Sequence, residues 1–84
     1  MNTHEAISRL SKALALLATD FEKEELRALV QDLADKKHQA YIEIGLATND
    51  TTSIMHGVMG MLSHYESIEQ QEHHEKRLNS LKQD

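Results

Sequence analysis

Residues 54 to 65 read IMHGVMGMLSHY, and this stretch contains no Lys, Arg, Asp or Glu in a chain where such residues make up 27% of the sequence. Its apolar residues recur at the three- and four-residue spacing of a helix. Placed at about 100° per residue, they cover about half of the circumference, which is wider than the stripe of roughly 100° that one neighbouring helix buries. The stretch therefore predicts a helix that is enclosed on more than one side.

Two glycines, Gly57 and Gly60, lie one turn apart within the same stretch. A glycine inside a helix costs about 1 kcal/mol relative to alanine, so the pair needs an offsetting benefit. The benefit that we expect is the close approach of another helix, with Gly60 facing it. In the plainer alternative, a three-helix bundle buries the apolar seam and the glycines have no role.

The small size of the chain favours a second chain as the source of the enclosing helices. A chain of 84 residues buries too small a fraction of its surface for a comfortable margin of stability, and without cysteine it has neither disulfides nor thiolate zinc sites to compensate. Oligomerisation is the remaining common way to gain buried area, and methionines supply an adaptable contact surface. The predicted oligomer or partner interface comprises Ile54, Met55, Gly57, Val58, Met59, Gly60, Met61, Leu62 and Tyr65.

The rest of the chain predicts an all-α fold in a single domain over residues 1–84. There is no proline, and glycine occurs only at 45, 57 and 60. Asn2 and Glu5 are spaced as a capping box, and in TNDTTS (48–53) Asn49 suits a left-handed cap while Asp50 can start the next helix. We expect a helical hairpin of two long helices with a shorter N-terminal helix, forming an oligomeric bundle. The expected helices cover about 3–18, 20–48 and 51–80, with a polar frayed tail from about 69.

Three residues of the expected second helix are candidates for partner contacts. Lys37 falls in the middle of that helix's apolar seam, where a charge is unfavourable unless its stem reaches solvent or its ammonium meets an acidic partner. Ile42 and Leu46 lie one turn apart on the opposite side. Lone exposed apolar residues are also ordinary on a monomer, so a role without a partner stays open for all three. The seam consists of Leu26, Val30, Leu33, Ala40, Ile44 and Ala47.

The sequence gives little support for metal binding or catalysis. His56 and His64 are eight residues apart, about 12 Å along a helix, so they cannot share one ion. The EHHE run at 72–75 is typical of a solvated polar face. Ser63 and His64 point about 100° apart and lack a third positioned group. We therefore expect no enzyme activity, no metal and no cofactor.

Charge and hydropathy argue against nucleic acid and membrane partners. The net charge is −5, and the basic residues are scattered among acids instead of forming the basic face that phosphate binding needs. The N-terminus lacks the cationic start and cleavage site of a signal peptide, and the apolar run at 13–18 is too short to span a bilayer. We expect a cytoplasmic protein.

These observations predict a small helical interaction protein, such as an adaptor, a co-chaperone or an inhibitor, that self-associates as a dimer or higher oligomer and binds a protein partner. The alternative is an oligomeric small-ligand binder that holds an anionic metabolite or nucleotide between chains. Its pocket would use Lys37, His64 and Tyr65. The outline resembles that of many small helical regulators, but no motif specifies one of them.

Overall fold

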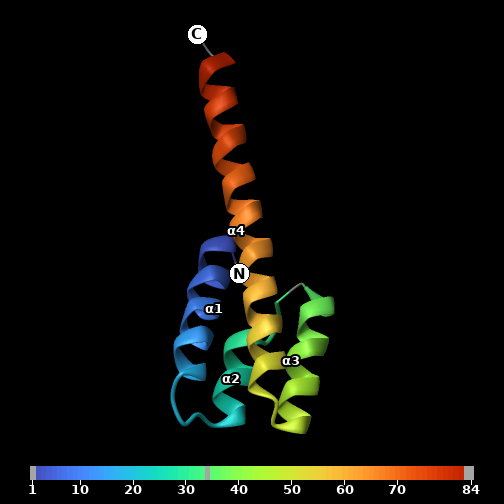
Figure 1. Cartoon of the computed structure of the whole chain (residues 1–84). Coiled ribbons are helices and arrows are strands. Elements are labelled where there is room, and N and C mark those ends of the chain that lie inside the picture. Colours follow the sequence, from blue (N-terminus) through green and yellow to red (C-terminus); the bar gives the residue numbers. More distant parts are fainter. Residues whose placement is uncertain (1, 34, 83–84) are drawn as a thin grey trace.

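The computed structural model describes the backbone of residues 2–33 and 35–82 and the side chains of residues 2–33 and 35–75. Within these ranges the chain is all-helical, as predicted, and contains no strand. The helices are α1 (Thr3–Leu17), α2 (Lys23–Val30), α3 (Lys36–Thr48) and α4 (Thr51–Lys82). Figure 1 shows α4 running the whole length of the molecule, with α1 and α3 beside its first half.

The start of α1 agrees with the capping box read from the sequence. The Asn2 side chain accepts a hydrogen bond from the Glu5 amide at 2.8 Å. At the other end, the Thr19 hydroxyl donates to the Leu16 carbonyl oxygen at 2.7 Å. Thr19 therefore closes α1, and α2 begins only at Lys23, with Glu22 at its N-cap position and no side-chain cap.

The prediction of one continuous helix over 20–48 is wrong, because the chain breaks between α2 and α3. Asp32 has a φ of 65°, a left-handed conformation in which no right-handed helix continues. Asp35 then starts α3 by accepting a hydrogen bond from the His38 amide at 3.3 Å. The Gln39 side-chain amide donates to the Leu33 carbonyl oxygen at 2.6 Å, so a residue of α3 satisfies a carbonyl in the break.

The break changes which face of the second segment is buried. Ile42 and Leu46, predicted to lie opposite the seam, are each 1% exposed and belong to the core. Ile44, which was assigned to the seam, is exposed. The predicted seam extended the helical phase of α2 across residues 31–35, and the left-handed turn there gives α3 a different phase.

The turn between α3 and α4 forms as the sequence indicated. Asn49 adopts the left-handed conformation with a φ of 56°, and the Asp50 amide donates to the Gly45 carbonyl oxygen at 2.8 Å. The Asp50 carboxylate accepts from the Thr52 amide at 3.1 Å and thereby caps α4. The turn returns the chain antiparallel to α3, and α3 and α4 pack against each other.

One apolar core joins the four helices. Extensive packing links α3 to α4, α4 to α1, and α1 to α2. Burial of each large apolar side chain stabilises the fold by about 1.5–3 kcal/mol, and no polar side chain is buried among the described residues. The buried apolar residues are Ala6, Leu10, Ala13, Leu17, Leu26, Val30, Leu33, Ile42, Leu46, Ile54, Val58 and Met61.

The second half of α4 extends beyond the bundle and makes the molecule elongated (Figure 1), with principal extents of 55 × 21 × 19 Å. The side chains of residues 70–75 are exposed there, and the backbone stays helical to Lys82. Leu78 and Leu81, the apolar positions of the predicted polar tail, have side chains outside the described residues. No helix of the described part combines the length and hydropathy needed to cross a membrane.

Candidate interaction surface

The glycines lie where α3 and α4 approach each other closely. A Cβ atom placed on Gly57 would be 2.7 Å from the His38 carbonyl oxygen, and one placed on Gly45 would be 2.8 Å from the Asp50 carbonyl oxygen. Real Cβ atoms are not found so close to backbone, so both positions require glycine. The helix that approaches the Gly57 face is α3 of the same chain.

Gly60 faces the same helix through a side chain. A Cβ atom placed there would collide with the imidazole ring of His38. The expectation that Gly60 faces a closely approaching helix is therefore confirmed, and the contact is made inside one bundle. This helix pair supplies one of the sides on which the uncharged stretch is enclosed.

A small polar cluster lies at the start of α3, next to these contacts. The His38 ring nitrogen Nδ1 is hydrogen-bonded to the Asp35 carboxylate, whose other oxygen accepts from the His38 amide. Partial burial acts to raise the pKa of Asp35. The hydrogen bonds from the His38 ring and amide, with the charges of His38 and His64, outweigh it, and the pKa lies below its ordinary value of 3.8. The cluster therefore holds a charged carboxylate over a wide range of pH.

Part of the predicted interface is not accessible to a second chain. Ile54, Val58 and Met61 are at most 2% exposed and pack in the core of their own chain, as Gly57 packs against α3. The burial of Ile42 and Leu46 likewise removes them from the surface where partner contacts were predicted. The methionine side of α4 is different, because Met55 and Met59 are exposed, while Leu62 and Tyr65 are partly buried against the core.

The large apolar side chains that are exposed belong to α3 and α4, the two helices that pack against each other. Among the described residues these are Tyr41 (40% exposed), Ile44 (58%), Met55 (42%) and Met59 (54%). The Tyr41 ring of α3 contacts the His56 ring of α4 edge-on, with the ring centroids 5.0 Å apart. This contact joins the exposed side chains of the two helices. We call Tyr41, Ile44, Met55, His56 and Met59 the outer face.

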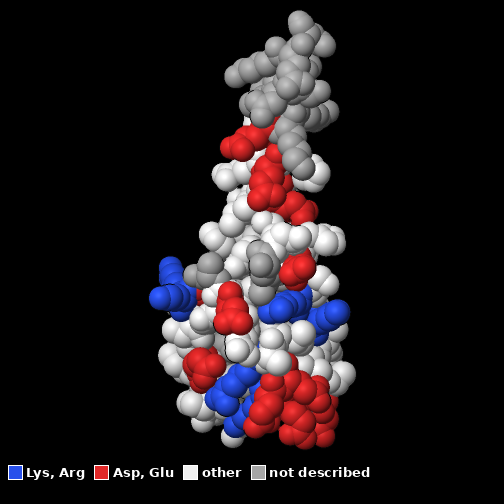
Figure 2. Space-filling view, turned by 180° about the vertical axis from the view of Figure 1, so that it is seen from behind, with Lys and Arg blue, Asp and Glu red and all other residues white. Residues whose placement is uncertain are grey.

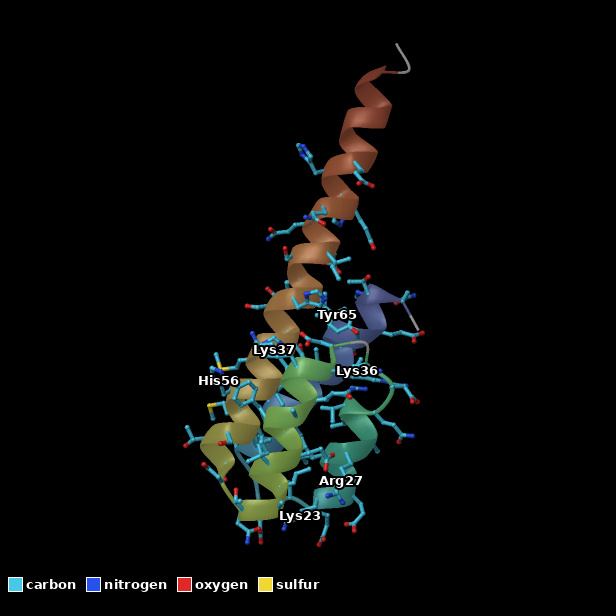
Figure 3. The ribbon with its side chains drawn as sticks, turned by 90° about the vertical axis from the view of Figure 1, so that its right-hand side faces the viewer. Lys23, Arg27, Lys36, Lys37, His56 and Tyr65 are labelled. Carbon is cyan, nitrogen blue, oxygen red and sulfur yellow. The ribbon has the colours of Figure 1, made fainter. Side chains whose placement is uncertain are left out.

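The outer face itself carries no Lys, Arg, Asp or Glu. Exposed neighbours of the face are Thr48, Thr52 and Ser63. Between residues 51 and 65, α4 has no Lys, Arg, Asp or Glu, and its two histidines are the residues that can become charged. Lys37 is exposed one turn before Tyr41, at the edge of the outer face. Figure 3 shows Lys37 and His56 on the neighbouring helices α3 and α4. The prediction that Lys37 lies in an apolar seam is therefore wrong.

Many of the acidic side chains lie elsewhere, although Glu43 is exposed next to Ile44 on α3 and Asp50 is exposed at the turn into α4. Figure 2 shows acidic side chains gathered at the foot of the molecule and along the projecting part of α4. At the foot, Asp20, Glu22, Glu24 and Glu25 are exposed around the α1–α2 connection. Along α4, Glu66, Glu69, Glu72 and Glu75 repeat every three residues. The outer face thus differs in charge from these two acidic regions.

The predicted ligand pocket is not built from its three residues. His64 and Tyr65 are in edge-on ring contact, with centroids 5.5 Å apart, and Lys37 is exposed. None of the three lines either of two cavities in the molecule. The larger, of about 300 Å³, lies between α2 and α3 beside the Arg27–Glu43 ion pair, and the smaller, of about 150 Å³, lies between Phe21 and the α3–α4 turn.

The other chemistry considered from the sequence finds no site in the described part of the chain. No group of three or more His, Asp or Glu side chains is placed there to hold a metal ion. Comparison with protein-family models, with curated protein sequences and with solved structures finds no significant match. The outer face is therefore the feature from which a function can be argued.

Sequence reasoning missed Tyr41 and Ile44 as surface residues. Ile44 was placed in the apolar seam, and Tyr41 was placed beside it, because helix 20–48 was taken as continuous. The available signal was the Asp35–His38 spacing, in which an Asp stands three residues before the amide that it caps. A helix start at 36 would have placed Ile42 and Leu46 inside and Ile44 outside.

Proposed function

We propose that this protein is a small helical interaction protein that self-associates through the outer face and, as an oligomer, binds a protein partner as an adaptor, co-chaperone or inhibitor. The observation that carries the proposal is that exposed Tyr41 and Ile44, one turn apart on α3, are linked to exposed Met55 and Met59 of α4 through the contact between the Tyr41 and His56 rings. Single exposed apolar residues are ordinary on a monomer, but a contiguous group marks an interaction site.

One property favours a second copy as the occupant of this face. The face offers no carboxylate and has Lys37 at its edge, so it lacks the charge that would select an oppositely charged partner, while two such faces can meet without repulsion.

Sedimentation velocity of an Ile44→Glu variant tests the proposal. Ile44 is the most exposed of the four large hydrophobic side chains of the outer face and is not in the core, so the fold should survive while a buried charge opposes association. Ser11→Glu, at an exposed position of α1, is the matched control. We expect wild type and control to sediment as the same oligomer and Ile44→Glu to sediment as a monomer. Equal association of all three would refute the outer face as the interface.

The alternative function, binding of a small anionic ligand, has one candidate site, the cavity of about 300 Å³, whose lining includes Arg27 but also the carboxylates of Asp32 and Glu43. Such a site would lie between α2 and α3 of one chain and not between chains at Lys37. A thermal-shift screen with nucleotides and metabolite anions discriminates the two functions, because a ligand at 100 times its Kd stabilises the fold by about 2.7 kcal/mol. A hit that is lost in Arg27→Gln would favour the ligand binder.

A further inference from the structure

We propose that self-association through the outer face is coupled to the loss of protons from His56, so that mild acid dissociates the oligomer. This inference rests on the proposed function, and it adds a regulation of the same surface. His56 is exposed, lies one turn from Met59, and touches the Tyr41 ring of α3. An occupant that covers Tyr41 and Met59 must therefore also cover the imidazole between them.

The charges around His56 leave its protonated form without a counter-ion. The element packed against it is α3, which presents the neutral phenol of Tyr41 and, one turn away, the cation Lys37. On α4, residues 51–65 contain no carboxylate. Glu43, a carboxylate of α3, is paired with Arg27 of α2 at 3.4 Å. The Asp35 carboxylate at the start of α3 is hydrogen-bonded to His38. The outer face of a second copy would contribute the same residues as the first and so would add no carboxylate.

The consequence follows from the cost of burying a charge. Histidine is the side chain that ordinarily changes charge between pH 5 and 8. A free chain can hold its imidazolium in water, whereas the associated face would bury it unpaired, at a large cost in free energy. In mild acid, association would therefore require each protonated His56 to give up its proton. By linkage, once the free chain is protonated, each further decrease of one pH unit raises the dissociation constant roughly tenfold for every proton that association must release.

Sedimentation equilibrium of the full chain at about pH 8 and about pH 5.5 tests this coupling. We expect the dissociation constant of the wild-type oligomer to be at least tenfold higher at the lower pH. His56→Gln keeps a neutral polar side chain at the same exposed position and should associate equally at both values. His4→Gln, at an exposed position near the start of α1, is the control for the other histidines and should behave as wild type. Circular dichroism at both pH values verifies that each variant stays folded.

The outcomes separate the inference from the function on which it rests. An oligomer whose dissociation constant does not change with pH overturns the coupling and leaves self-association intact. A pH dependence that persists unchanged in His56→Gln also overturns it, because another group then takes up the protons. A chain that is monomeric at both pH values overturns the self-association itself and the coupling with it.

Discussion

A single methyl group at Gly57 would disturb the contact between two helices. A Cβ atom there would lie 2.7 Å from the His38 carbonyl oxygen and 2.7 Å from Ile42 Cγ1. We predict that Gly57→Ala lowers the free energy of unfolding, because an overpacking cost of about 1–3 kcal/mol outweighs the ~1 kcal/mol gain in helix propensity. A net loss of ~1 kcal/mol lowers the melting temperature by about 4–8 °C in a domain of this size.

Gly60→Ala is the matched comparison for this prediction. Its new Cβ atom meets the His38 side chain and not the backbone, so the ring can yield at the expense of its hydrogen bond to Asp35. Thermal unfolding followed by circular dichroism should therefore show a smaller loss for Gly60→Ala than for Gly57→Ala. A Gly57→Ala variant that melts at or above the wild-type temperature would contradict the close packing of α3 on α4.

The contribution of Asp35 to the stability of the fold depends on pH. Its pKa in the folded chain is lowered below 3.8 by His38 and His64, so its charge stabilises the fold above pH 3.8 and this contribution disappears as the pH falls through the lowered value. Asp35→Asn keeps an N-cap side chain without the charge. We expect the variant to be less stable than wild type in urea at about pH 6, and the difference to shrink below pH 3.8. A difference that is independent of pH would argue against the ionised carboxylate.

The elements are set by local signals of unequal strength. The turn at Asn49 and Asp50 is predictable from the sequence. Asn49 adopts the left-handed conformation that asparagine favours at a helix C-terminus, and the Asp50 carboxylate accepts a hydrogen bond from the Thr52 amide as a helix cap. The break at 31–35 contains neither glycine nor proline and depends on Asp32 adopting a left-handed conformation. Left-handed aspartate is tolerated but not specified by sequence, so the position of the break was not predictable with confidence from periodicity alone.

Substitution at Asp32 tests the break directly. Asp32→Val should destabilise the fold by about 1–2 kcal/mol, because a β-branched residue strongly disfavours a φ of 65°. Asp32→Gly should be close to neutral, since glycine adopts this conformation without steric cost. Gln31→Val is the matched control, at an exposed neighbour with a φ of −63°. If Asp32→Val and Gln31→Val unfold at the same urea concentration, the left-handed turn at Asp32 is contradicted.

The same break explains how much of the candidate surface could be predicted. The uncharged stretch at 54–65 correctly indicated a helix buried on more than one side, and Met55 and Met59 were in the predicted interface. Ile54, Val58 and Met61 were in it too, although they fill the core of their own chain. Helical periodicity identifies apolar sides but not which of them faces α1, α3 or a second chain, because that depends on tertiary packing.

The whole molecule combines a small core with an elongated outline. The four helices bury one apolar cluster, while α4 projects beyond them and leaves an accessible surface of 6014 Å² (Figure 1). A chain of this size has a narrow margin of stability as a monomer, so burial of the outer face against a second copy would add stability that depends on protein concentration. Self-association through that face is the central claim.

Light scattering coupled to size exclusion, at micromolar chain concentrations, tests this claim most directly. Scattering gives the mass independently of the elongated shape, which would distort an elution volume. The outer face predicts a mass of at least twice the 9.6 kDa of one chain, falling toward one chain on dilution. A mass of 9.6 kDa throughout the micromolar range would contradict the claim and leave Tyr41, Ile44, Met55 and Met59 as exposed residues of a monomer.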